Sequence, residues 1–169
     1  GKNNKMFYIP MILASLGMRR GEICALTVDD IEGDIVHITK SLARDINNNW
    51  IIDIPKTTES NRDIIIPMKL ADMIREQGYV YKGHPNSITE KLYKIQKQLG
   101  IPKFSIHKLR HYFASVLSAN NVPEADILAL GGWNTEHVMK SIYRYSMLDK
   151  KEQAKRNAIN SITNSLDFN

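Results

Sequence analysis

The sequence has 169 residues, which suits one well-packed domain and is short for two. Its 43% hydrophobic and 24% charged residues are typical of a globular protein and exclude a disordered chain. The net charge of +5 is compatible with a nucleic-acid partner, although many other proteins share such an excess. The single cysteine, Cys24, excludes an intramolecular disulfide and a four-cysteine zinc site, and it suits a reducing compartment.

An apolar stretch from Met6 to Met18 follows two lysines, as the apolar region of a secretory signal peptide does. However, Pro10 interrupts the stretch, no small-residue cleavage site follows, and its length is too short to cross a bilayer. We therefore interpret it as a core helix and expect no membrane partner. Because the chain starts close to this helix and without an initiating methionine, we expect it to be part of a longer protein.

The first expected elements are two helices, followed by a group of strands. One helix covers about residues 4–17, either kinked or begun near Pro10, and a short one covers residues 21–26. Gly17 is the expected stop of the first helix. Three segments rich in β-branched residues come next, and they are 34–39, 50–54 and 62–66. Since polar loops separate them, we expect three antiparallel strands joined by hairpins.

From Pro67 onward the hydrophobic pattern is helical, and glycines and prolines punctuate it. The expected helices are 68–77, 87–99, 105–120, 123–130, 135–147 and 149–162. The predicted fold class is therefore α+β and mainly helical, with a small three-stranded antiparallel sheet inserted after the first helices.

Four short segments contain residues that could carry chemistry. They are Gly17–Glu22, Pro55–Thr57, His107–His111 and Gly131–Trp133, the last followed by Tyr143. Taken one at a time, each has an ordinary structural explanation. An arginine pair often marks a solvated helix end, a hairpin lysine is usually a solvated loop residue, and a helical tyrosine usually packs in the core.

His107 and His111 lie four residues apart on one helix face, as the two zinc ligands of an H-E-x-x-H motif do. Here Lys108 stands where that motif has its glutamate, Arg110 would repel a cation, and no third ligand is evident, so we expect no metal site. His107 and Arg110, three residues apart, also share a face. An imidazole donor beside a guanidinium suits a phosphate, although a basic stripe on a surface helix explains this segment equally well.

The order of the four segments resembles the tyrosine recombinase family, which includes the phage integrases, and the resemblance covers nearly the whole chain. The stretch SLGMRRGEICAL is similar to the family's first box and places the first catalytic arginine at Arg19. The PKT stretch before a strand is similar to the hairpin segment that carries the family's lysine, here Lys56. The stretch HKLRHYFA resembles the second box and implicates His107 and Arg110.

The sequence departs from the family pattern at three points, one of which, Leu16 in place of the leading threonine of the first box, we treat as neutral. Trp133 stands where the family usually has a histidine, and its indole can donate a hydrogen bond but cannot exchange a proton. The nucleophile could be Tyr143 or Tyr145, which point to nearly opposite sides of a helix. Tyr145 continues an apolar stripe with Ile142, as a packed residue would, so the pattern favours Tyr143.

The resemblance implies a site-specific recombinase or integrase that cleaves and rejoins DNA through a 3′-phosphotyrosine link. Arg19 and Arg110 would clamp the phosphate, His107 would accept the tyrosine proton, and Lys56 would protonate the leaving 5′-oxygen. Glu22 would cap a helix or hold Arg19. No cofactor or metal is expected. The alternatives are a DNA-binding protein of this fold without catalysis, and a transposon or dimer-resolution recombinase that uses the same chemistry.

The expected partner is double-stranded DNA, on which such proteins form a higher assembly, here a tetramer, while the fragment alone is expected to be monomeric. Residues 1–169 would form a single catalytic domain in the C-terminal part of a longer protein, without the family's N-terminal core-binding domain. Residues 149–169 would be a C-terminal helix and tail, whose apolar stripe could dock on its own domain or on a neighbour. We expect a cytoplasmic location, in a bacterial cell or an infected or element-bearing host.

Overall fold

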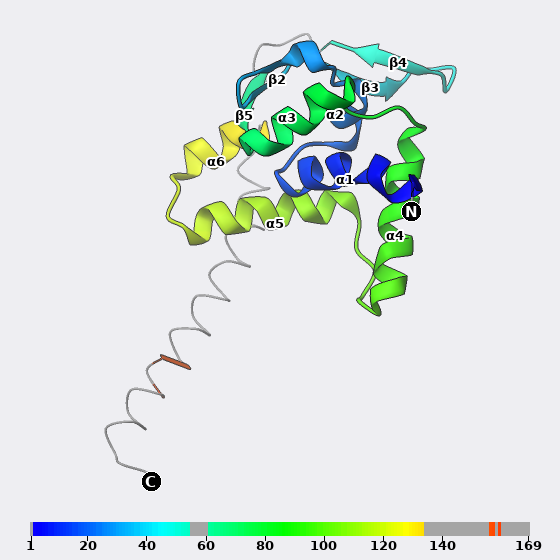
Figure 1. The fold of residues 1–169 in the computed structure, drawn as a ribbon. Coiled ribbons are helices and arrows are strands. Elements are labelled where there is room, and N and C mark those ends of the chain that lie inside the picture. The colour runs from blue at the N-terminus through cyan, green and yellow to red at the C-terminus, as the bar shows by residue number, and fades with distance from the viewer. Residues whose placement is uncertain (1, 55–60, 134–155, 158, 160–169) are drawn as a thin grey trace.

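The computed structural model describes residues 2–54, 61–133, 156–157 and 159 (Figure 1). The helices are α1 (Lys2–Ser15), α2 (Arg20–Ala25), α3 (Met68–Gln77), α4 (Pro85–Leu99), α5 (Ile106–Ala119) and α6 (Glu124–Gly131), with a 3-10 turn, η1 (Val28–Asp30). The strands are β1 (Ile31–Glu32), β2 (Ile35–Ile38), β3 (Ser41–Arg44), β4 (Trp50–Asp53) and β5 (Arg62–Ile65).

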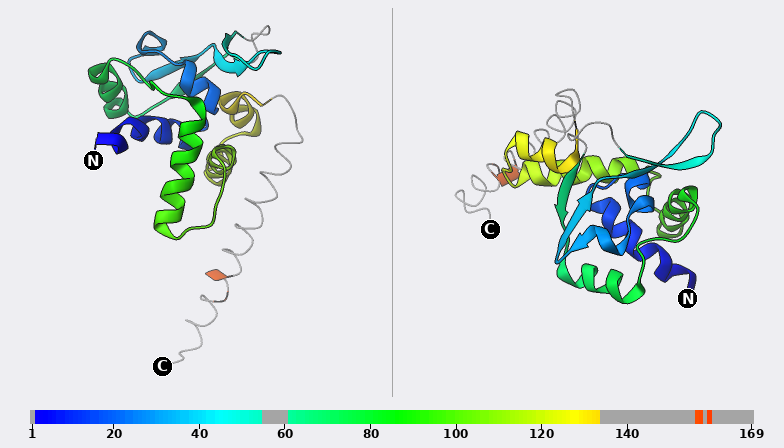
Figure 2. Two further views of the ribbon diagram at one scale, coloured as in Figure 1. Left: turned by 90° about the vertical axis from the view of Figure 1, so that its right-hand side faces the viewer. Right: turned by 90° about the horizontal axis from the view of Figure 1, so that it is seen from above.

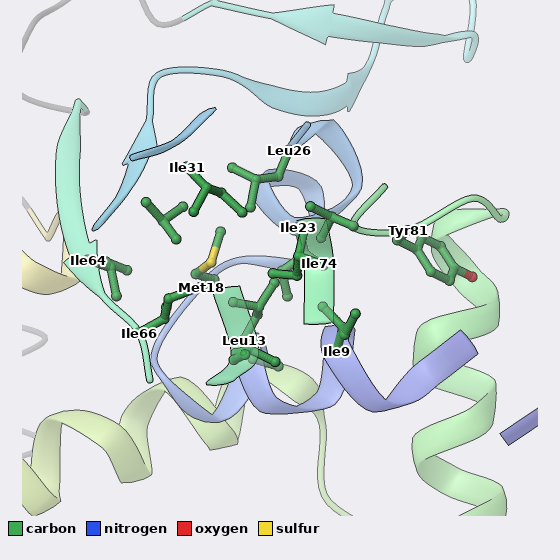
Figure 3. Close-up of a cluster of buried hydrophobic side chains, with 14 of the residues drawn as sticks. Ile9, Leu13, Met18, Ile23, Leu26, Ile31, Ile64, Ile66, Ile74 and Tyr81 are labelled. Atoms are coloured by element: carbon green, nitrogen blue, oxygen red, sulfur yellow. The ribbon is translucent and has the colours of Figure 1, made fainter. Parts of the chain in front are cut away.

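The main hydrophobic core lies where α1, α2, α3 and the sheet of β1, β2 and β5 meet (Figure 3). Leu13 of α1, Ile23 of α2, Ile74 of α3 and Ile64 of β5 are all essentially inaccessible to solvent. Burial of each such side chain stabilises the fold by about 1.5–3 kcal/mol before entropy is counted. Because α1 also packs against α4 and α5, it forms the centre of the domain (Figures 1 and 2).

The strands form two antiparallel sheets, which differs from the single row of hairpins that the sequence predicts. One sheet has the order β1–β2–β5, and the other contains β3 and β4. In the first sheet β2 pairs directly with β5, so that Val36 faces Ile64 in the register. The expected pairing of segment 34–39 with segment 50–54 is therefore wrong, because β4 pairs with β3 instead.

Strand β3 was missed because its sequence, SLAR, contains no β-branched residue. Its pairing with β4 depends on the turn between them, in which the Asp45 carboxylate accepts hydrogen bonds from the backbone N–H groups of Asn47 and Asn49. Ile51 and Ile52 of β4 are exposed, and the ribbon formed by β3 and β4 projects from the body of the domain (Figures 1 and 2).

Strand β5 alternates between buried and exposed residues. Its two buried positions are occupied by Arg62 and Ile64, so an arginine shares the inward face of the strand with a core isoleucine. This register places a charged side chain inside the domain, where it must find partners.

The predicted helices from residue 68 to residue 131 agree with the structure to within about two residues at each end. Helix α1 continues through Pro10 rather than starting there. The expected helix 135–147 lies outside the described residues, and of the expected helix 149–162 the structure describes Arg156, Asn157 and Ile159, which are helical. Within the described part of the chain, every helix is too short or too polar to cross a membrane.

Gly17 ends α1 with a φ of +89°, and a Cβ atom there would lie 2.5 Å from Cδ1 of Phe113 on α5. We expect Gly17→Ala to lower the free energy of unfolding by about 2–5 kcal/mol, because it combines a left-handed backbone with overpacking. Gly78→Ala is the matched control, since Gly78 has a φ of +77° and open space around its Cα. Urea unfolding should show that Gly78→Ala lowers the free energy of unfolding by only about 1–2 kcal/mol. Equal losses for the two variants would contradict the close packing of α1 on α5.

Candidate active site

Arg19 and Glu22 form a capping arrangement at the start of α2. The Glu22 carboxylate accepts a hydrogen bond from the Arg19 backbone N–H at 2.7 Å, which satisfies a free donor at the helix N-terminus. The same carboxylate accepts a second bond from Nη1 of Arg19, also at 2.7 Å. The prediction that Glu22 caps a helix and holds Arg19 is therefore confirmed.

Arg62 approaches the same carboxylate from the opposite element, β5. Its Nη1 and Nη2 atoms donate to the two Glu22 oxygens at 2.8 Å each, and both side chains are 5% exposed. This two-pronged geometry is the strongest form of an arginine–carboxylate pair. Sequence reasoning assigned Arg62 no role. The signal that could have revealed it is its spacing of two residues from Ile64 in a strand, which puts both on the inward face.

Arg110 comes from α5 and is 1% exposed. Its Nη1 donates to the Gly17 carbonyl at 2.8 Å, and its Nη2 donates to the Gly131 carbonyl. The ring of Trp133 lies over the guanidinium, 4.4 Å from its central carbon, in a cation–π contact. Among the described residues, Nε of Arg110 has no hydrogen-bond partner although it is buried.

The C-terminal end of α6 gathers three arginines. The three successive carbonyls of Leu130–Gly132 accept hydrogen bonds from Arg62 Nε at 2.8 Å, from Arg110 Nη2, and from Arg19 Nη2 at 2.7 Å, respectively. The last carbonyls of a helix lack intrahelical partners and carry the negative end of its dipole. One helix end therefore holds side chains from three separate parts of the sequence.

The described side chains of this cluster carry more positive charge than negative, since three guanidinium groups surround the single carboxylate of Glu22. Burial, followed by the positive charges of Arg19 and Arg62, lowers the pKa of Arg110 to about 9, while Glu22 has a smaller opposite effect. Arg110 stays protonated near neutral pH at a cost in free energy. An anion bound here would relieve that cost.

His107 lies one helical turn before Arg110 on α5. The His107 side chain is exposed on α5, yet the desolvation that it retains, followed by the charges of Arg110 and Arg19, lowers its pKa below the ordinary value of 6.5. His107 is therefore mainly neutral at pH 7 and able to accept a proton. The centroids of the His107 and His111 rings lie 4.9 Å apart, and the two rings are arranged edge to face. Within the described part of the chain, no three histidine, cysteine or acidic side chains lie close enough to hold a metal ion.

The structure brings three of the six predicted site residues, Arg19, Arg110 and Trp133, together at the end of α6, and it places His107 one helical turn before Arg110 on α5. Lys56, Tyr143 and the alternative nucleophile Tyr145 lie outside the described residues. The catalytic roles of all these side chains stay predictions. What the geometry adds is the convergence of Arg19 and Arg110, which occupy separate regions of the sequence, on neighbouring peptide groups of one turn.

Comparison with known proteins identifies the family of this chain. The model of the Phage integrase family matches residues 3–149, and the chain belongs to that family. A protein of Caldanaerobacter subterraneus subsp. tengcongensis described as tyrosine recombinase XerC-like is 23% identical in an alignment 192 positions long. The alignment covers 90% of this chain and 49% of the relative. The chain thus spans about half the length of that curated relative.

Solved structures share the fold. The Tn1549 transposon integrase, in complex with transposon right-end DNA, superimposes with a TM-score of 0.69 at 18% identity, over 86% of this chain and 58% of the integrase chain. XerA recombinase gives a TM-score of 0.59 at 17% identity, over 89% of this chain and 59% of that one. XerH recombinase bound to its palindromic difH substrate gives a TM-score of 0.59 at 15% identity, over 90% of this chain and 45% of the XerH chain. The predicted resemblance and fold class are confirmed.

We expect Glu22→Gln to lower the free energy of unfolding by about 3–5 kcal/mol near pH 7, because it leaves buried arginines without their counter-charge. Burial opposes ionisation of Glu22, but the hydrogen bonds and charge of Arg62, and then those of Arg19, hold its pKa below the ordinary 4.5. A depressed pKa in the folded state stabilises the fold above pH 4.5, and this stabilisation is lost as the pH falls through the folded value. The difference between wild type and variant should therefore shrink under acid conditions.

Urea unfolding near pH 7 and near pH 3 measures this difference. The matched control is Asp72→Asn, which removes an exposed carboxylate paired with Arg75 and should cost less than about 1 kcal/mol at either pH. If Glu22→Gln lowers the free energy of unfolding by the same amount at both pH values, the charge of Glu22 is not what stabilises the cluster.

The pKa of His107 offers a test of the geometry that needs no activity. Proton NMR titration of the DNA-free protein should give a value below 6.5, and Arg19→Ala should raise it because one nearby positive charge is removed. Arg75→Ala is the control, since Arg75 lies on α3 and pairs with Asp72. If the titration of His107 is the same with and without the Arg19 side chain, the two groups do not share a site.

Proposed function

We propose that this chain carries the active site of a site-specific DNA recombinase, which cleaves and rejoins strands through a covalent 3′-phosphotyrosine intermediate. The observation that supports this function best is the cluster of Arg19, Arg62 and Arg110 at one helix end, with one carboxylate among them. Such a cluster favours a bound anion, and the phosphodiester is the anion on which the family acts. The DNA-bound states of the Tn1549 integrase and of XerH agree with double-stranded DNA as the partner.

Arg19 and Arg110 stabilise the transition state in this proposal. Attack on phosphorus increases the negative charge of the non-bridging oxygens, which fixed donors stabilise most strongly. The Arg19 side chain is 40% exposed, and its bonds to Glu22 and Gly132 leave other N–H groups of the guanidinium for a phosphate. Loss of one such donor typically slows the reaction by about 10²–10³-fold.

Arg110 reaches the phosphate only after a local rearrangement, because the Trp133 ring covers its guanidinium. The indole moves aside when DNA binds and turns its N–H toward a phosphate oxygen, in the place of the histidine that the family usually has. The unpartnered Nε of Arg110 and the energetic cost of its buried charge favour this exchange of partners.

Proton transfers complete the cleavage step. The Tyr143 oxygen attacks phosphorus while His107, neutral near pH 7, accepts the phenolic proton. The bond from phosphorus to the 5′-oxygen breaks, and Lys56 donates a proton to that oxygen. The phosphodiester energy is retained in the 3′-phosphotyrosine bond, so the 5′-hydroxyl of another strand can reverse the step. None of these steps requires a metal or an organic cofactor.

In the same proposal, residues 1–169 act as one catalytic domain of a longer protein. Most sequence selection then belongs to the remainder of that protein, while this domain binds DNA mainly through phosphate contacts that weaken with salt. Four copies assemble on DNA, inside the cytoplasm of the host cell. Integration, transposon excision and dimer resolution all use this chemistry.

A second candidate function is DNA binding without catalysis. The observation that favours it is the burial of Arg110, which is 1% exposed and covered by an aromatic ring. The two candidates differ in one measurable product, a covalent adduct between protein and DNA.

The decisive experiment uses the full-length protein and a pool of nicked suicide duplexes of randomised sequence, first enriched for bound DNA. An adduct that resists denaturing detergent should form with EDTA present, disappear in Tyr143→Phe and persist in Tyr145→Phe. The opposite pattern would move the nucleophile to Tyr145. An adduct that requires magnesium would overturn the mechanism, and tight binding without any adduct would favour the second candidate.

A further inference from the structure

We propose that Arg62 is a positioning residue for strand cleavage, which acts by holding Arg19 in place and does not itself contact DNA. This inference rests on the proposed function. It begins from the fact that Arg62 is 5% exposed and, unlike Arg110 within the described part of the chain, has no unpartnered nitrogen to offer to a phosphate of a duplex. All three of its nitrogens instead donate to protein groups, two to Glu22 and one to the Leu130 carbonyl.

The first route from Arg62 to Arg19 passes through Glu22. The two-pronged bond from Arg62, at 2.8 Å to each oxygen, fixes both the position and the plane of the carboxylate. Oxygen Oε1, held in this way, is the acceptor for Nη1 of Arg19 at 2.7 Å. A single charge opposite Glu22 would neutralise it, but only the planar fork of an arginine sets its orientation.

The second route passes through the turn after α6. Nε of Arg62 donates to the Leu130 carbonyl, two residues before the Gly132 carbonyl that accepts from Nη2 of Arg19. Gly132 also packs directly on both arginines, since a Cβ atom there would lie 3.1 Å from Nη1 of Arg62 and 3.5 Å from Nη1 of Arg19. Of the two hydrogen-bond acceptors of the Arg19 side chain within the described structure, Arg62 therefore binds Glu22 directly and packs against Gly132, next to the turn that it bonds at Leu130.

A purely structural role for Arg62 makes a different prediction. As a counter-charge for Glu22 it would affect the amount of folded protein, whatever side chain stands at position 19. As a positioning residue it affects the rate of cleavage only while the Arg19 guanidinium is present, because residues that act as a unit are strongly non-additive. Arg62→Lys separates the two roles, since it keeps the charge but cannot bond both carboxylate oxygens and the Leu130 carbonyl together.

The test is a double-mutant cycle on the single-turnover rate of adduct formation, with full-length protein saturated with the enriched suicide duplex. We expect Arg62→Lys to slow cleavage by about 10–100-fold in the otherwise unchanged chain, and by less than about 3-fold in the Arg19→Ala background. Arg75→Lys is the matched control, an arginine on α3 that should leave the rate unchanged in both backgrounds. Circular dichroism at the assay temperature measures the folded fraction of each variant, and rates refer to folded protein.

If Arg62→Lys folds poorly, a second substrate keeps the test decisive. A methylphosphonate at the scissile position removes a negative oxygen and with it much of the need for Arg19. The rate penalty of Arg62→Lys should then fall by about 10-fold or more relative to the phosphate substrate, whereas a folding defect slows both substrates equally.

Three results overturn the inference even though the wild type forms its adduct. These are an equal rate penalty in both Arg19 backgrounds, an equal penalty on both substrates, and a rate for Arg62→Lys that matches the wild type. If the wild type forms no adduct with any enriched duplex, the proposed function fails first and the inference about Arg62 fails with it.

Discussion

The buried carboxylate of Glu22 is the constraint on which the site depends. It accepts four N–H bonds, two from Arg62 and two from Arg19, and it is the counter-charge within the described cluster of three guanidinium groups. Leaving such a charge unpaired in a protein interior would cost several kcal/mol. Satisfying it ties the start of α2 to β5, and Arg62 then ties β5 to the end of α6. Glu22 and Arg62 together thereby link three elements, α2, β5 and the end of α6.

Among the described residues, this network carries more positive than negative charge, and that property is what supports the proposal of a phosphate ligand. Desolvation, and then this excess of positive charge, lowers the pKa of both Arg110 and His107. The first effect makes an added anion favourable, and the second keeps an imidazole neutral beside two arginines, as a proton acceptor must be. The carbonyls at the end of α6 occupy the arginines in the DNA-free state, with weaker acceptors than a phosphate provides. Arg19 is thus held in place by the protein itself, whereas in the proposed function the guanidinium of Arg110 is first uncovered by a movement of Trp133.

The register between β2 and β5 determines that Arg62 faces this network. Strand β2 pairs with β1 on one side and with β5 on the other, and the pairing of Val36 with Ile64 sets which face of β5 turns inward. A slip of one residue would turn Arg62 outward and place Asp63 against Glu22. The hydrophobic residues of β2 and β5 therefore fix the site as well as the core, because burial of Val36 and Ile64 selects the register that buries Arg62.

Local features of the chain could be predicted from its residues alone. Helical periodicity located α3 to α6 closely, the i, i+3 spacing put His107 and Arg110 on one face, and family motifs identified Arg19. The folded structure was needed to show that β4 pairs with β3, that Arg62 belongs to the site, and that Leu130–Gly132 supply the carbonyls that hold three arginines. The physical reason is that spacing along a helix is repeated every few residues and is visible in the chain. Pairing between strands, and the partners of a buried charge, depend instead on segments that meet only after folding.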